Sequence, residues 1–302
     1  MFRLGVALAP KLTGTGRLVP AAPGQARLSR MKASVLLCSL AASLAVGWIL
    51  SPSVSMAQVP RYSAVMLACA RLSEEVRTDL QVSAGPAGHR ERIARSGTLQ
   101  VRGAPAPAGV AVTLWYDSLT LWRERGGLRE EAETGGLVGG RYLGTLGLSG
   151  GYLAADRPFL PDEVREMADL SDAPAELFPP LADLALGPGG VVLLDGGWTL
   201  TRLRDSLSGG TAIGRYKLVG RRSRQETGAS GDSLSPSQRV DEEEEGEVVW
   251  SPGRGLLAWR RTIEARAEAA AVVPLRGPIR TRLTEQILVR RLTDDPDCAP
   301  TR

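Results

Sequence analysis

The stretch that decides the fold is Leu256 to Ala269, which reads LLAWRRTIEARAEA. Leu257, Trp259, Ile263 and the alanines that follow occupy one parity, and charged or polar residues occupy the other. Successive side chains of a β-strand point to opposite faces, so this stretch has one apolar face and one wet face, broken only by Arg261. It has no good apolar stripe at helical spacing and is predicted to be a β-strand.

A second stretch, Ile279 to Leu292 (IRTRLTEQILVRRL), alternates in the same way. Leu283 and Ile287 share the apolar parity, which Thr281 and Glu285 interrupt. Such alternation is typical of an antiparallel sheet with one solvated face. The segment from Trp250 to Leu256, with its Ser-Pro-Gly-Arg-Gly centre, predicts a hairpin turn.

Other segments add strands and a few short helices. The further predicted strands are Ile93–Val101, Gly109–Leu121, Val138–Leu146, Val191–Leu194, Thr199–Leu203 and Ile213–Arg221. Spacings of four, three and four among Val65, Cys69, Leu72 and Val76 predict a helix from Ser63, its N-cap, to about Val76. Proline and two acids at 161–163 open a short helical insertion over residues 160–185. The predicted fold is mainly β, a large curved antiparallel sheet or half-barrel with a short helical insertion.

Residues 224–246 are rich in Ser, Gly and Gln and contain the acidic run Asp241–Glu245. This composition predicts a disordered loop, because such a segment buries too little apolar surface to become ordered. An acidic patch for calcium or a basic partner is the alternative, but calcium sites need ligands interleaved with turn residues.

The first 57 residues are predicted to be absent from the working protein. Arg30 and Lys32 precede an uncharged apolar run from Ala33 to Leu50, and small residues at Ser55 and Ala57 fit a signal-peptidase site. We therefore expect a non-structural extension at 1–30, a signal peptide at 31–57 and a single β-rich domain at 58–302 that is secreted or periplasmic. An uncleaved membrane anchor is the alternative, because 18 residues are the lower limit for a span.

These first 57 residues, which we call the leader, also account for the net positive charge of the chain. The leader holds six of the 37 basic residues and none of the 33 acidic ones, which leaves the remainder at −2 rather than the +4 of the whole chain. Nucleic-acid binding needs a basic face and gains no support from this balance. Contact with a membrane is expected only through the signal peptide.

Export changes the interpretation of the cysteines. Cys69 and Cys298 lie near the two ends of the expected mature domain, and a lone pair in an oxidising compartment usually forms a disulfide. In the chain-entropy model, a bridge across so long a loop contributes roughly 4–5 kcal/mol. Two unpaired thiols are the alternative.

None of the candidate catalytic motifs has all the residues and the structural context that its chemistry requires. Gly147–Gly151 matches G-x-S-x-G, but that chemistry needs a strand–elbow–helix context and a downstream histidine, whereas the single histidine is His89. Gly231–Leu234 spells the signature of the GDSL esterases without their later histidine. One histidine cannot build a zinc site, and no phosphate-binding G-x-x-x-x-G-K pattern exists. No catalytic, metal or cofactor-binding residues are assigned, and no cofactor is expected.

Aromatic and aliphatic residues of the predicted strands are candidates for a ligand cavity. Ordinary core packing is the simpler interpretation, because large aromatic side chains normally supply core burial. The candidate cavity-lining residues are Trp115, Tyr216, Leu257, Trp259, Leu283 and Ile287.

The second half of the chain resembles exported bacterial β-rich proteins of unknown function. The resemblance rests on Gly196-Gly197-Trp198, Arg215–Leu218, the hairpin Trp250–Leu257 and the final Arg-rich strand ending Leu288–Leu292. Their order is distantly similar to periplasmic lipoprotein carriers, in which a curved sheet wraps an apolar cavity. The resemblance covers roughly residues 188–293, is a pattern of strands and turns, and implies a fold more than a function.

Three functions remain open at this stage. The leading hypothesis is a non-enzymatic binding protein that holds an apolar or amphipathic ligand, or a partner chain. The second is a structural or interaction module of the cell envelope, without a cavity, that binds another envelope protein. The third is a carboxylate-based hydrolase, for which two acidic side chains in reach of one another in a cleft would be the mark.

Overall fold

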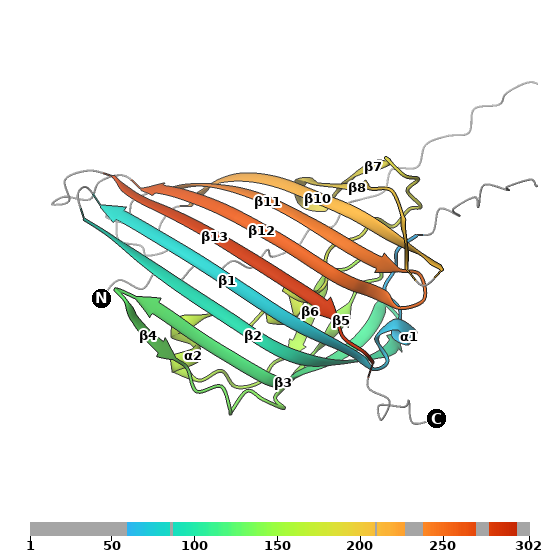
Figure 1. Ribbon diagram of the computed structural model, residues 1–302, viewed down its shortest axis with the longest axis horizontal. Helices are drawn as coiled ribbons and strands as arrows, with labels where there is room; N and C mark the ends of the chain where they lie inside the picture. The colour runs from blue at the N-terminus through green and yellow to red at the C-terminus, as the bar shows by residue number, and fades with distance from the viewer. Residues whose placement is uncertain (1–58, 85–86, 209, 227–237, 270–277, 295–302) are drawn as a thin grey trace, which may run out of the picture. The chain divides into compact units, whose positions relative to one another are not determined.

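The computed structural model describes residues 59–84, 87–208, 210–226, 238–269 and 278–294 (Figure 1). These residues form one open antiparallel sheet of thirteen strands, not closed into a barrel, and only short helices. The predicted mainly β fold with a large antiparallel sheet is therefore confirmed. Among the described residues, no helix has both the length and the apolar character to cross a membrane.

The strands fall into two consecutive groups, one on each side of the helical insertion. The first group comprises β1 (Ala70–Ala84), β2 (Ala87–Ala106), β3 (Gly109–Arg125), β4 (Leu128–Glu131), β5 (Arg141–Leu146) and β6 (Tyr152–Asp156). The second comprises β7 (Val191–Leu194), β8 (Trp198–Arg202), β9 (Ser206–Ser208), β10 (Thr211–Glu226), β11 (Gln238–Ser251), β12 (Gly255–Ala269) and β13 (Ile279–Arg291). A short 3-10 turn (Asp195–Gly197) joins β7 to β8.

The first and last strands of the domain pair in the middle of the sheet. The strand order is β6-β5-β3-β2-β1-β13-β12-β11-β10-β8-β7, with β4 beside β3 and β9 beside β10. The β1–β13 register runs from Leu72 opposite Arg291 to Ala84 opposite Ile279. This one long-range pairing joins two meanders into a single sheet.

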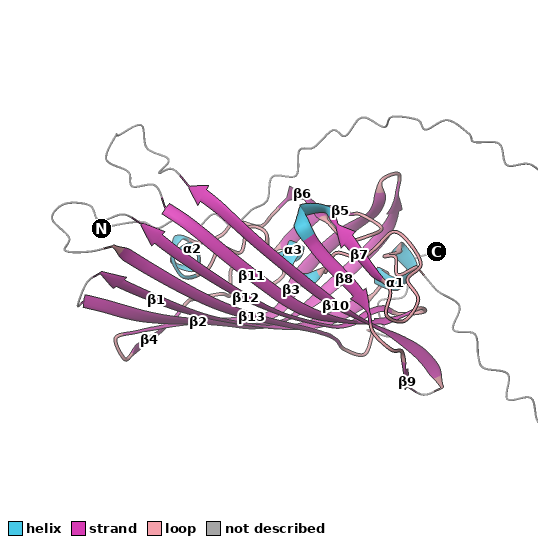
Figure 2. Ribbon diagram, turned by 90° about the horizontal axis from the view of Figure 1, so that it is seen from above, coloured by secondary structure: helices cyan, strands magenta, loops and turns pink. Residues whose placement is uncertain are grey.

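The helical insertion is a consequence of this order. Strands β6 and β7 lie at opposite edges of the sheet, so the chain between them must cross one face. Helices α2 (Asp162–Met167) and α3 (Ala173–Leu177) lie in this connection, on one side of the sheet (Figure 2). We call this side the inner face. The predicted insertion over residues 160–185 is confirmed, and its apolar residues, such as Leu170 and Leu177, are fully buried.

The predicted helix from Ser63 to Val76 is wrong beyond its first turn. Helix α1 covers only Ala64–Leu67, with Met66 donating to the Ser63 hydroxyl as the N-cap prediction required, and β1 begins at Ala70. From there alternate residues are buried, and both neighbouring strands pair along nearly the whole length of β1. Tertiary strand pairing therefore overrides a local spacing that also fits a helix face.

The predicted loop over 224–246 is wrong at both ends. Residues 224–226 end β10, and 238–246 belong to β11, while 227–237 lie outside the described residues. The acidic run is part of a strand that pairs with β10 on one side and β12 on the other, and two of its acids lie beside basic side chains of β10. Lys217 Nζ lies 2.6 Å from Glu245 Oε1, and Arg221 Nε lies 3.3 Å from Glu243 Oε1.

The ends of β1 and β13 lie beside each other. The Leu292 amide donates to the Arg71 carbonyl at 2.8 Å, two residues after Cys69. Cys298 and the predicted leader segments 1–30 and 31–57 lie outside the described residues. The disulfide and the cleaved signal peptide therefore stay predictions.

Candidate functional site on the inner face

The structure brings four of the six candidate cavity residues to the inner face. Tyr216, Trp259 and Ile287 are buried there, and Leu283 is half-buried on the same face. Tyr216 and Trp259 lie in one row across the sheet, because both are in register with Val248 of β11. Ile287 and Leu283 lie farther along β13, opposite Arg261 and Ala265 of β12.

The other two candidates, Trp115 and Leu257, lie elsewhere. Trp115 lies on the opposite, outer face, where the Arg102 guanidinium stacks 5.3 Å from its ring centroid. In β12 a bulge inserts one residue, since Val249 pairs with Ala258 while Trp250 pairs with Leu256. The bulge reverses the parity, so that Leu256 is buried with Trp259 and Leu257 is only half-buried.

The half of the inner face nearer α1 is a packed core. Tyr62 stacks edge-on against Phe178 and Trp250, at centroid distances of 5.6 and 5.1 Å, and its hydroxyl donates to the Pro179 carbonyl. Residues 178–182 thereby fix the insertion over this end of the sheet. The buried side chains here fill space, as the core-packing interpretation expects.

A polar belt crosses the inner face where this core ends. It consists of Arg95, Glu74, Glu285, Arg261 and Glu244, which come one each from the neighbouring strands β2, β1, β13, β12 and β11. Each strand contributes one charged residue, so acidic and basic side chains lie next to each other across five strands.

The first part of the belt anchors the insertion. Arg95 Nη2 lies 2.7 Å from Glu74 Oε1 and 2.6 Å from Glu176 Oε2, and Arg95 Nε donates to Glu74 Oε2 at 3.2 Å. The Tyr116 hydroxyl also donates to Glu74, at 2.9 Å. Glu176 belongs to α3, so this network ties the helix to the centre of the sheet.

The second part of the belt lies in the C-terminal half of the chain. Arg261 Nε lies 2.6 Å from Glu244 Oε1, and Arg261 Nη2 donates to Glu244 Oε2 at 2.7 Å. The Thr78 hydroxyl donates to Glu285 Oε2 at 3.2 Å. Each charged side chain of the polar belt therefore has a partner, which offsets the cost of burying it.

Burial shifts the pKa values of several belt groups. Burial raises the pKa of Glu176 to about 7; the Arg95 charge opposes this rise, and the nearby Glu285 and Glu74 charges add to it. Burial also raises the pKa of Glu244, against the effect of Arg261. Burial by itself would lower the pKa of Arg95, but the charges of Glu74 and Glu176 hold it well above its ordinary value.

Glu74 and Glu176 are two carboxylates that reach the same guanidinium, which bears on the hydrolase hypothesis. The Glu74 side chain is 0% exposed, so substrate has no access to it in this structure. The arrangement can hold a helix in place by charge-assisted hydrogen bonds, and it offers no open acid–base pair.

Beyond the belt, the inner face is apolar but only partly covered. We call Leu80, Val82, Leu283, Ala265 and Ala267 the distal patch. All five are half-buried and lie on three adjacent strands, with Leu80 opposite Leu283 and Leu283 opposite Ala265. With strands about 4.8 Å apart and about 6.8 Å between alternate residues, the distal patch measures on the order of 10 by 7 Å between Cα atoms.

Charged residues border the distal patch on both sides. Glu91 on β2 lies 3.5 Å from Arg125 and 3.9 Å from Arg123. On the other side Glu242 of β11 is buried and pairs in register with Arg222 of β10. An apolar strip with charged borders is suited to a molecule that has both apolar and polar parts.

The rejected motifs are placed as turns or strand ends. The Gly147 amide donates to the Gly151 carbonyl, and the Gly147 carbonyl accepts from the Gly150 amide. These two hydrogen bonds form the turn between β5 and β6. His89 is exposed on β2, and the Gly231–Leu234 motif lies outside the described residues. No cluster of metal-ligating side chains occurs in the described part of the chain.

The polar belt was missed by reasoning from the sequence, although its signal was present. Arg261 and Glu285 were the two charged interruptions on the apolar parities of the deciding stretches. Glu244 lay within an acidic run that suggested a solvated loop. A charged residue that breaks an apolar parity can mark a buried ion pair on the core face.

Comparison with known proteins does not identify a family for this chain. No protein-family model and no curated protein matches the chain. A solved structure of lipid–protein interactions in lipovitellin is similar at 10% identity and a TM-score of 0.41 over 79% of this chain. The match covers 26% of lipovitellin, so this chain spans about a quarter of its length.

Two further solved structures are similar at lower scores. The β domain of the Bordetella autotransporter BrkA matches at 11% identity and a TM-score of 0.27, over 74% of this chain and 100% of that one. An outer membrane channel from Pseudomonas putida F1 matches at 10% identity and 0.18, over 74% and 96%. These scores carry no argument about function.

Proposed function

We propose that this chain is an exported, non-enzymatic binding protein that holds an amphipathic molecule on the inner face of its sheet. The observation that carries the proposal is the change along that face. Side chains are fully buried on the α1 side of the polar belt, and those of the distal patch beyond it remain half-exposed.

The apolar part of the ligand would cover the distal patch. Burial of apolar surface contributes about 25 cal/mol per Å², so covering even part of an acyl chain there is favourable. The polar part would stay at the charged borders, near Glu91 and Arg123 or near Glu242 and Arg222. If the ligand had no polar part, the charged side chains at these borders would remain in contact with water only.

The test uses two neighbouring residues of β13 that point to opposite faces. Leu283 lies in the distal patch, whereas Thr284 lies on the outer face opposite Glu264. We expect Leu283→Glu to weaken binding of the uncharged dye Nile red by about tenfold or more, because it places a carboxylate against the apolar strip. Thr284→Glu should leave the affinity unchanged. Both variants are checked for native circular dichroism.

Native mass spectrometry of the gently purified full chain gives a second readout. Bound amphipathic molecules should accompany the wild-type protein and be reduced in Leu283→Glu. If the wild type binds no dye and carries no small molecule, the proposal fails. A protein partner recovered instead by cross-linking in the envelope would favour the interaction-module hypothesis.

A further inference from the structure

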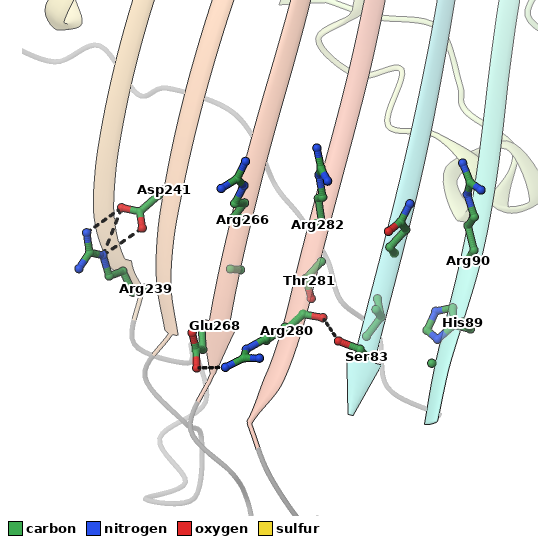
Figure 3. A pocket seen from close by; sticks show the side chains of 14 residues that line it. Ser83, His89, Arg90, Arg239, Asp241, Arg266, Glu268, Arg280, Thr281 and Arg282 are labelled. Carbon is green, nitrogen blue, oxygen red and sulfur yellow. Dashed lines mark hydrogen bonds and ion pairs between the residues drawn. The ribbon is translucent and has the colours of Figure 1, made fainter. Parts of the chain in front are cut away.

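A hollow of about 920 Å³ lies at the end of the sheet farthest from α1 (Figures 1 and 3). Most of its lining residues are on the outer face, and Val82 and Ala267 of the distal patch also contribute to it. Strands β1, β2, β11, β12 and β13 contribute its lining. The lining carries more positive than negative charge, since its only acids are Asp241 and Glu268. Its five arginines are Arg90, Arg239, Arg266, Arg280 and Arg282.

The strand register places two of these arginines directly opposite each other. Arg266 of β12 pairs with Arg282 of β13, and Figure 3 shows both side chains extending in the same direction. Like charges at directly opposed positions destabilise a sheet. This pair therefore raises the question of what balances its charge.

The other arginines of the hollow have partners of their own. Arg90 Nε donates to Asp79 at 2.9 Å, Arg239 Nε donates to Asp241 at 3.1 Å, and Arg280 lies 3.6 Å from Glu268.

Arg266 and Arg282 share a single carboxylate, Glu264, at the longer distances of 3.7 and 3.5 Å. Asp241 of β11 lies in register opposite Arg266, but its carboxylate pairs with Arg239. Among the described residues, no carboxylate other than Glu264 forms an ion pair with Arg266 or Arg282. Both residues are exposed, so an anion from solution can reach them.

We propose that Arg266 and Arg282 together bind the phosphate group of a phosphorylated ligand. Adjacent strands lie about 4.8 Å apart, so two guanidinium groups on them can donate to the oxygens of one phosphate. Guanidinium–phosphate pairs form two parallel charge-assisted hydrogen bonds. A bound phosphate also removes the repulsion between the two arginines.

This site is independent of the proposed inner-face function. Arg282 and Leu283 are consecutive residues of one strand and therefore point to opposite faces. The chemistry to be recognised is the phosphate, whether it comes from a soluble phosphorylated compound or from a lipid headgroup, and the experiment separates the two sources.

The experiment compares two double variants of the full chain with equal changes in charge. Arg266→Gln with Arg282→Gln removes the proposed site. Arg215→Gln with Arg221→Gln removes two arginines from the same face that are paired with Glu247 and Glu243. Titration calorimetry at low ionic strength measures binding of inorganic phosphate, and co-sedimentation measures binding to vesicles of the phosphate-free lipid digalactosyldiacylglycerol with and without phosphatidylglycerol.

We expect the wild type to bind at least one of the phosphate-bearing probes, and the first double variant to lose about tenfold or more in affinity. The control variant should bind as the wild type does. Thermal unfolding should show the first variant to be no less stable than the wild type, because it loses opposed like charges. Binding of inorganic phosphate assigns a soluble ligand, and binding only to vesicles with phosphatidylglycerol assigns a headgroup.

Three results would overturn the proposal. The wild type could bind neither probe. It could bind vesicles equally well with and without phosphatidylglycerol. The control variant could lose as much affinity as the first variant, which would mean that general charge, and not the Arg266–Arg282 pair, governs binding.

Discussion

Two tryptophan rings occupy space above glycines of neighbouring strands. A β-carbon built on Gly220 would lie 2.0 Å from the Trp198 ring, and one on Gly246 would lie 2.3 Å from the Trp259 ring. Both glycines are on the inner face, in register with Glu244 and Arg261 respectively. Covering a strand glycine with an aromatic ring restores the contacts that the missing side chain would have made.

Replacement of Gly220 by alanine should therefore destabilise the protein. The new methyl group overlaps the Trp198 ring, and overpacking of this kind costs about 1–3 kcal/mol. Gly253→Ala is the matched control, because a β-carbon there meets nothing within 4 Å. Urea unfolding followed by tryptophan fluorescence gives both free energies, and equal values for the two variants would contradict the packing described here.

At the scale of elements, helix α3 is held by a hydrogen bond as well as by apolar contacts. Its Glu176 reaches Arg95 at 2.6 Å, and Arg95 is in turn held by Glu74 of β1. The helix has only five residues and no side-chain cap, so it depends on tertiary contacts for its stability. The polar belt, which lies between the packed core and the distal patch, thus also positions the helical insertion.

The docking of α3 should depend on pH. The pKa of Glu176 rises on folding from 4.5 to about 7, so the folded state binds the proton more tightly than the unfolded state. The stability contributed by this group is then fully present below about pH 4.5 and is lost as the pH rises through about 7. We expect Glu176→Gln to gain stability relative to the wild type across this window.

The measurement is the free energy of unfolding of both proteins from pH 5 to pH 8. Glu163→Gln, which removes an exposed acid from α2, serves as the control. Its free energy of unfolding should change with pH in the same way as that of the wild type. If the difference between Glu176→Gln and the wild type stays constant with pH, the raised pKa is refuted.

At the scale of the whole molecule, the pairing of β1 with β13 holds two meanders together. Its register covers thirteen residue pairs and brings residue 292 beside residue 71. The chain after β13 therefore leaves the sheet close to Cys69, and Cys298 follows within a few residues. This geometry supports the proposed disulfide between Cys69 and Cys298, which would lock the central pairing.

Loss of that bridge should reduce stability under oxidising conditions. Cys69→Ser and Cys298→Ser are each expected to lower the free energy of unfolding by about 2–4 kcal/mol. The double variant should equal either single one, and a reductant should remove the difference from the wild type. If alkylation of the denatured, unreduced protein modifies both cysteines, the bridge does not exist.

Local patterning predicted most of the strands because alternation requires only that a segment lie on a half-buried sheet. The segment Val191–Leu194 matches β7 at both ends, and the turn between Trp250 and Leu256 joins β11 to β12 as predicted. The pattern failed at β1, where a helical spacing was also present, and at Leu257, where one bulged residue reverses the parity.

Thus the residue sequence by itself determined the antiparallel sheet, its hairpins and the helical insertion, because these follow from the alternation, glycines and prolines of short segments. Tertiary structure alone decided that β1 pairs with β13, that Arg261 and Glu244 meet in a buried belt, and that Arg266 faces Arg282. Those outcomes depend on strand order and register, which arise from pairings between residues far apart in the chain. A single segment shows that Arg261 interrupts an apolar parity, but it does not show which residue Arg261 meets.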